Sequence, residues 1–121
     1  MIIQVNNKQA EQIANALELQ SRILAGQFEE IIHLFYNKDF DRDSVEYCLK
    51  QLKILLFPEL YWREIYPIGS KKLDDRAKNC YDIYKTIQHE LHKNDDTWSI
   101  HKDKPILCNE ENGIKIIEED V

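Results

Sequence analysis

The sequence predicts an α+β domain that is mainly helical, with about four helices and a small antiparallel sheet at its C-terminal end. Apolar residues recur at spacings of three and four along most of the first 93 residues, which is the period of an amphipathic helix. The chain has only three Gly and three Pro in 121 residues, too few for a turn-dense β fold. A 43% hydrophobic share provides material for one core, so we expect a single domain over residues 1–121.

Two helices are expected in the first 36 residues. The β-branched segment 2–5 predicts a short edge strand, and the pair Asn6-Asn7 predicts a helix cap. A first helix then runs to Gly26, where glycine favours a stop, and a shorter second helix covers residues 27–36. Their apolar stripes are Ala10, Ile13, Ala16, Leu17, Ile23 and Leu24 in the first, and Phe28, Ile31, Ile32 and Phe35 in the second.

Two further helices flank an irregular connection at 58–72. Asp43 is a suitable cap for the third, and Pro58 ends it. The fourth, at about 73–93, has the most regular pattern, with apolar residues at strict 4-3-4-3-4 spacing, which predicts a helix–helix seam. The expected apolar faces are Val45, Cys48, Leu49, Leu52, Leu55 and Leu56 in the third helix, and Leu73, Ala77, Cys80, Tyr84, Ile87 and Leu91 in the fourth.

The C-terminal pattern changes to short stretches separated by polar turns. Segments 97–101, 106–108 and 114–117 are therefore predicted as small strands, and residues 118–121 as a frayed acidic end.

Composition and charge exclude several classes of function. The net charge of −6 is concentrated in the last dozen residues and no segment is strongly basic, so we expect no nucleic-acid partner. Three widely spaced cysteines fit neither a disulfide framework nor a metal knuckle. With no signal peptide or membrane span in evidence, we expect a cytoplasmic protein that does not bind a membrane. Glycines at 26, 69 and 113 cannot form a phosphate-binding loop, and we expect no cofactor.

The candidate binding residues lie mostly in the irregular connection. Tyr61, Trp62, Arg63 and Tyr66 are residue types enriched at binding hot spots, although the aromatic rings could equally anchor the loop to the core. Arg22 is added as a possible partner for a phosphate group.

Histidine and cysteine provide weaker candidates. His89 and His92 are three residues apart on one helix, whereas a zinc-hydrolase helix needs a spacing of four, so they favour a solvated pair over a metal site. His33 and His101 are isolated. Cys48 and Cys80 are expected to pack in the core, and Cys108 has no neighbour that would activate its thiol.

Two stretches carry a resemblance to a known group. Residues 21–31 (SRILAGQFEEI), and Ala77 followed by residues 81–89 (YDIYKTIQH), resemble small uncharacterised proteins carried by phages and integrated mobile elements. The resemblance implies a bacterial cytoplasmic setting and supplies no activity or catalytic residue.

The function expected from these observations is a non-enzymatic protein-binding module, such as a phage- or mobile-element-encoded inhibitor or immunity-type protein that occludes a partner. One alternative is a protein that binds a small ligand or nucleotide messenger through Arg22, Tyr61, Trp62 and Arg63. Others are a metal-dependent or thiol enzyme using His89, Glu90 and His92 or Cys108, and an assembly protein that forms homo-oligomers through an exposed helical face.

Overall fold

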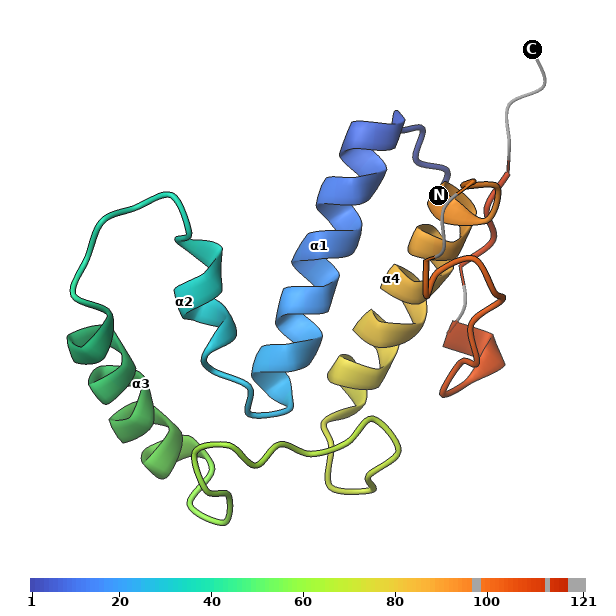
Figure 1. Ribbon diagram of the computed structural model, residues 1–121. Helices are drawn as coiled ribbons and strands as arrows, with labels where there is room; N and C mark the ends of the chain where they lie inside the picture. Colours follow the sequence, from blue (N-terminus) through green and yellow to red (C-terminus); the bar gives the residue numbers. More distant parts are fainter. Residues whose placement is uncertain (97–98, 113, 118–121) are drawn as a thin grey trace.

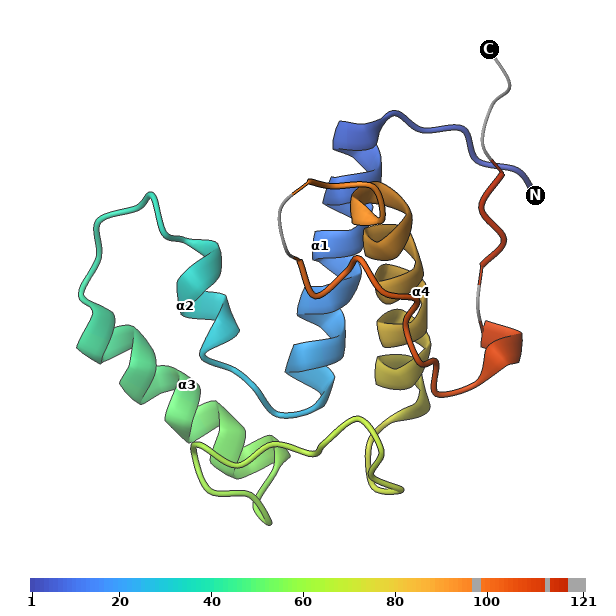
Figure 2. The same cartoon turned by 45° about the vertical axis from the view of Figure 1, so that its right-hand side comes forward.

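The computed structural model describes residues 1–96, 99–112 and 114–117, which form four α-helices and one 3₁₀ turn. The helices are α1 (Asn7–Leu24), α2 (Glu30–Leu34), α3 (Arg42–Leu56) and α4 (Asp75–His92), followed by η1 (Glu110–Asn112). Figure 1 shows α1 and α4 side by side, with α2 and α3 forming an arm on the other side of α1. In both views α3 is the outermost element of that arm (Figures 1 and 2).

The helix boundaries follow from local capping. Asn6 caps α1 as expected, since its side chain accepts from the backbone N–H of Gln9 at 2.8 Å while Gln9 bonds back to the N–H of Asn6 at 3.0 Å. Gly26 follows the end of α1 with a φ of +94°, a conformation that glycine adopts most easily. The cap of the third helix lies two residues earlier than predicted, because the side chain of Asp41, and not that of Asp43, accepts from the N–H of Ser44.

The contact between α1 and α4 forms the centre of the molecule. The predicted stripe of α4 is confirmed: Leu73, just before the helix, and four of its helical residues are buried, and Leu91 packs against the same core. On α1 the stripe is partly wrong, because Ala14 is fully buried whereas Ile13 is exposed. Small residues let the two backbones approach, and the hydroxyl of Ser21 donates to the carbonyl of Ala77 at 2.9 Å.

A second part of the core joins the arm to this helix pair. Phe28, Ile32 and Leu49 are buried together, with Phe57 packed edge-on against Phe28 at a centroid distance of 5.8 Å. Phe57 also meets the ring of Tyr66 at 6.2 Å, which links the arm to the base of α4.

The expected sheet is wrong: no described residue is in a strand. Residues 2–5 extend from α1 without a neighbouring strand, and residues 97–98 and 118–121 lie outside the described part of the chain. Segments 99–109 and 114–117 run as irregular chain on either side of η1, part of it across α4 (Figure 2). The physical reason is that α4 supplies the hydrogen-bond partners that a neighbouring strand would otherwise provide. The backbone N–H groups of Cys108 and Asn109 both donate to the carboxylate of Asp82, at 2.8 and 3.1 Å.

Candidate functional site

The aromatic segment after α3 is partly an anchor and partly displayed. Trp62 is half-buried against the α2–α3 core, and Tyr66 donates from its hydroxyl to Glu59 and from its backbone N–H to the carbonyl of Ala25. The hydrogen bond to Glu59 raises the pKa of the Tyr66 hydroxyl. Tyr61 is 82% exposed and Arg63 is exposed, so only these two of the four predicted residues are fully available to a partner.

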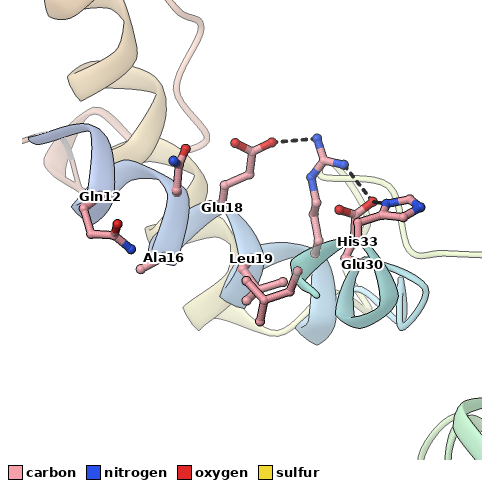
Figure 3. Close-up of a pocket in the computed structure, with 9 residues that line it drawn as sticks. Gln12, Ala16, Glu18, Leu19, Glu30 and His33 are labelled. Atoms are coloured by element: carbon pink, nitrogen blue, oxygen red, sulfur yellow. Dashed lines mark hydrogen bonds and ion pairs between the residues drawn. The ribbon is translucent and has the colours of Figure 1, made fainter. Parts of the chain in front are cut away.

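Arg22 lies in a different place from the aromatic segment. Its guanidinium bonds to Glu18 at 2.6 Å and to Glu30 at 3.2 Å, on the wall of a groove of about 370 Å³ between α1 and α2 (Figure 3). His33 also faces Glu30, at 3.6 Å. None of residues 61–66 lines this groove, and the two carboxylates neutralise Arg22. The geometry therefore does not support the alternative in which Arg22 joins Tyr61 and Trp62 to bind a phosphate.

The predicted histidine pair is held by hydrogen bonds that point to different partners. His89 Nδ1 lies 2.9 Å from the carbonyl of His101, whereas His92 Nδ1 lies 2.7 Å from Asp95 and its Nε2 is 3.7 Å from Glu11. Burial, with the nearby Lys85 and His92, lowers the pKa of His101. Within the described residues no group of three His, Cys, Asp or Glu side chains is arranged to hold a metal ion. These contacts instead attach Asp95 and His101 to the end of α4.

Of the two cysteines predicted to pack in the core, only one is buried. Cys80 is buried as predicted, and burial raises the pKa of its thiol. Burial and the adjacent Asp82 raise the pKa of the Cys108 thiol as well, which disfavours the reactive thiolate. Cys48 is exposed, so its assignment to the core is wrong.

Exposure of Cys48 is part of a larger departure on α3. Only Leu49 of the predicted apolar face is buried; Val45 is half-buried, and the rest of that face is exposed to solvent. We refer to the exposed side of this helix as the α3 arc. It covers about 200° of the helix circumference at 100° per residue. Its residues are Ser44, Tyr47, Cys48, Gln51, Leu52, Ile54, Leu55 and Leu56.

Three charged residues lie on the side of α3 opposite the arc, whereas Arg42 and Asp43 in its first turn are exposed. Glu46 and Lys50 are half-buried and pair at 3.7 Å, while Lys53 is only 1% exposed. The Lys53 ammonium donates to the carbonyl oxygens of Trp62 at 2.9 Å and Glu64 at 2.5 Å, and burial lowers its pKa. Lys53 thus faces the protein, although an amphipathic helix ordinarily keeps such a charge in solvent, and the aliphatic side chains of Leu52, Ile54, Leu55 and Leu56 are exposed.

Sequence reasoning missed two buried charged residues, Lys53 and Asp82. Neither stands in a motif, and a lysine or aspartate within an amphipathic helix is ordinarily solvated. For the α3 arc a signal did exist, since the apolar face of this helix is visible in the sequence. What the sequence could not show is that none of the described residues covers this face.

Comparisons with known proteins add no further constraint, since no protein-family model, curated protein or solved structure matches the chain. In the described part of the chain, no helix is both long and apolar enough to span a bilayer.

Proposed function

We propose that this chain is a protein-binding module without catalytic activity, and that the α3 arc is its interface. The observation that carries the proposal is the set of four aliphatic side chains that α3 exposes to solvent, Leu52, Ile54, Leu55 and Leu56. Exposed apolar residues scattered singly are normal on a protein surface, but a contiguous helical face of them marks an interaction site.

The available binding energy supports this assignment. Leu52, Ile54, Leu55 and Leu56 are between 43% and 77% exposed. Full burial of one such side chain contributes about 1.5–3 kcal/mol, so covering the remaining surface of all four would contribute about 3–7 kcal/mol. The entropic cost of association is ~4–15 kcal/mol, so the gain from burying these four side chains is comparable to the lower part of that cost. Burial of Tyr47 and Cys48 would increase the gain.

The nature of the arc favours recognition of another apolar protein surface over recognition of a small polar ligand. It is a convex helix face, whereas small-molecule sites are concave and enclose most of the ligand. Only Ser44, Gln51 and the hydroxyl of Tyr47 supply polar side-chain groups, so directed hydrogen bonds are few.

Site-specific photo-crosslinking tests the proposal. A photoreactive residue replaces Leu55, which is 77% exposed, or, as a matched control, Gln20, an exposed position on α1. Purified protein and a lysate of the source cells are irradiated in parallel. We expect discrete higher-mass products from position 55, absent from position 20 and lost when Leu52→Glu is added. Equal labelling at both positions, or none at position 55 in either sample, contradicts an interface on α3.

A further inference from the structure

Two imidazole rings meet where the chain after α4 returns to that helix. His92, in the last turn of α4, and His101 lie with ring centres 5.9 Å apart and ring planes inclined by 31°. The backbone carbonyl of His101 also lies 2.9 Å from His89 Nδ1, so His101 contacts α4 through both its ring and its main chain. We propose that this contact is a pH-sensitive latch, which is closed while His101 is neutral and opens when His101 takes up a proton. The latch is independent of the α3 arc and of its proposed function.

The two rings differ in the counter-ions available to them. His92 Nδ1 lies 2.7 Å from Asp95, and its Nε2 lies 3.7 Å from Glu11 on α1. A positive charge on His92 is therefore paired with a carboxylate on each side of the ring. Among the residues that the structure describes, no carboxylate forms an ion pair with His101. Only one of the two rings can therefore carry a charge that is neutralised locally.

The other groups that face His101 oppose a second proton on balance. Partial burial is the largest cause that lowers the pKa of His101, followed by Lys85 and His92 on α4. Glu18 and Glu11 on α1 raise that pKa by less, so it lies below its ordinary value of 6.5. A proton on His101 would place another positive charge beside Lys85 and His92, in a position partly removed from water.

The direction of the pH response follows from this difference. When the contact opens, His101 is solvated and titrates near 6.5. The open state then binds the proton more readily than the closed state, so acidification favours opening. The latch is at full strength above pH 6.5, weakens as the pH falls to the lower pKa of the closed state, and weakens no further below it.

An NMR titration of the full chain measures the first property. The imidazole Cε1–H signal of His101 should titrate below 6.5 in the unaltered protein. Lys85→Gln removes a positive charge that faces the ring, so the pKa of His101 should rise toward 6.5. Lys78→Gln removes the same charge from the first half of α4, away from His101, and should leave this pKa unchanged.

Amide hydrogen exchange, corrected for intrinsic rates, measures opening between about pH 7.5 and pH 5. The backbone N–H groups of His101 and Lys102 both donate to Ser99, and they should lose protection on acidification. Each unit by which the pKa of His101 lies below 6.5 corresponds to a tenfold loss of protection. The amides of Cys108 and Asn109 are held separately by Asp82, so they should stay protected.

Three variants make the exchange experiment decisive. His101→Gln cannot take up a proton in this range, so its exchange should no longer depend on pH. Lys85→Gln keeps the imidazole and should reduce the loss of protection by the same factor by which the pKa of His101 has moved. His33→Gln removes an exposed histidine from α2 and should retain the full pH response.

Four results would overturn the latch. They are a pKa of His101 at or above 6.5, protection of His101 and Lys102 that does not change with pH, a pH-dependent loss that persists in His101→Gln, and an unaltered response in Lys85→Gln. Loss of protection at Cys108 and Asn109 with the same midpoint would also overturn it, because the response would then be unfolding beyond the His101 contact.

Discussion

Asp82 provides the most direct test of how the C-terminal segment is held. Its carboxylate is fully buried on α4, where it accepts hydrogen bonds from the backbone N–H groups of Cys108 and Asn109 at 2.8 and 3.1 Å. Replacing Asp82 with Ala removes both acceptors at once. The two N–H groups then have to find other partners, and the irregular chain after α4 loses its attachment at mid-helix.

The expected loss of stability in Asp82→Ala follows from the type of hydrogen bond that is removed. A hydrogen bond to a charged group contributes about 1.5–3 kcal/mol net, so the two together contribute about 3–6 kcal/mol. Asp82→Asn keeps one carbonyl oxygen but turns an amide NH₂ toward one backbone donor, so we expect a loss of roughly half that amount or more. In a domain of this size, a loss of 3 kcal/mol lowers the melting temperature by about 10 °C.

Urea denaturation and amide hydrogen exchange measure the two consequences. We expect the Asp82→Ala variant to unfold at lower urea concentration and to lose protection at the amides of Cys108 and Asn109. Asn79→Ala, at an exposed position on the same helix, is the matched control and should change stability by no more than about 0.5 kcal/mol. Unchanged protection of both amides in Asp82→Ala, or a loss of stability below about 1 kcal/mol, would refute the reasoning.

Three further predictions concern a turn, a buried phenol and a helix cap. Gly26→Ala should cost about 1–2 kcal/mol in urea denaturation, because φ is +94° and the added Cβ would lie 3.1 Å from Leu60 Cδ1; an unchanged midpoint would contradict this. Burial raises the pKa of Tyr84, so the unfolded chain loses this proton first and stability should fall as pH rises above about 10. Tyr84→Phe should flatten that fall, and an identical slope in the variant would count against it. The carboxyl pKa of Asp74, lowered to about 2 by its hydrogen bonds from Arg76, should move toward 3.8 in Arg76→Ala when followed by NMR titration, and no movement would exclude the pairing.

The sequence predicted best where a periodic pattern coincided with the main packing contact. The α4 stripe from Leu73 to Leu91 was identified correctly because α4 buries that stripe against α1. On α1 the same method favoured Ile13, although the buried position is Ala14. Hydrophobicity ranks isoleucine above alanine, but a close helix–helix contact selects small side chains. The packing distance that decides between them is absent from the sequence of either helix alone.

The C-terminal prediction failed for a related reason. Short apolar stretches between polar turns are typical of strands, yet a strand forms only if another strand offers a matching ladder of hydrogen bonds. Here the donors of residues 108–109 bond to a single side chain, Asp82, which lies 26 residues earlier on a helix. Local patterns contain no information about such a distant acceptor.

The orientation of α3 is set by specific contacts. Rotating α3 to bury Leu52 and Leu55 would pull the Lys53 ammonium away from the carbonyl oxygens of Trp62 and Glu64, and would remove Leu49 from its cluster. Two hydrogen bonds from a charged donor contribute about 3–6 kcal/mol, which is similar to the roughly 3–7 kcal/mol that the exposed aliphatic groups could gain by burial. Within one chain these two contributions compete. Once another apolar surface covers the α3 arc they add, because the lysine keeps its carbonyl partners while the aliphatic side chains leave water. A partner on this face should therefore stabilise the α3 orientation described here, and the stability of the arm should rise with occupancy of the arc.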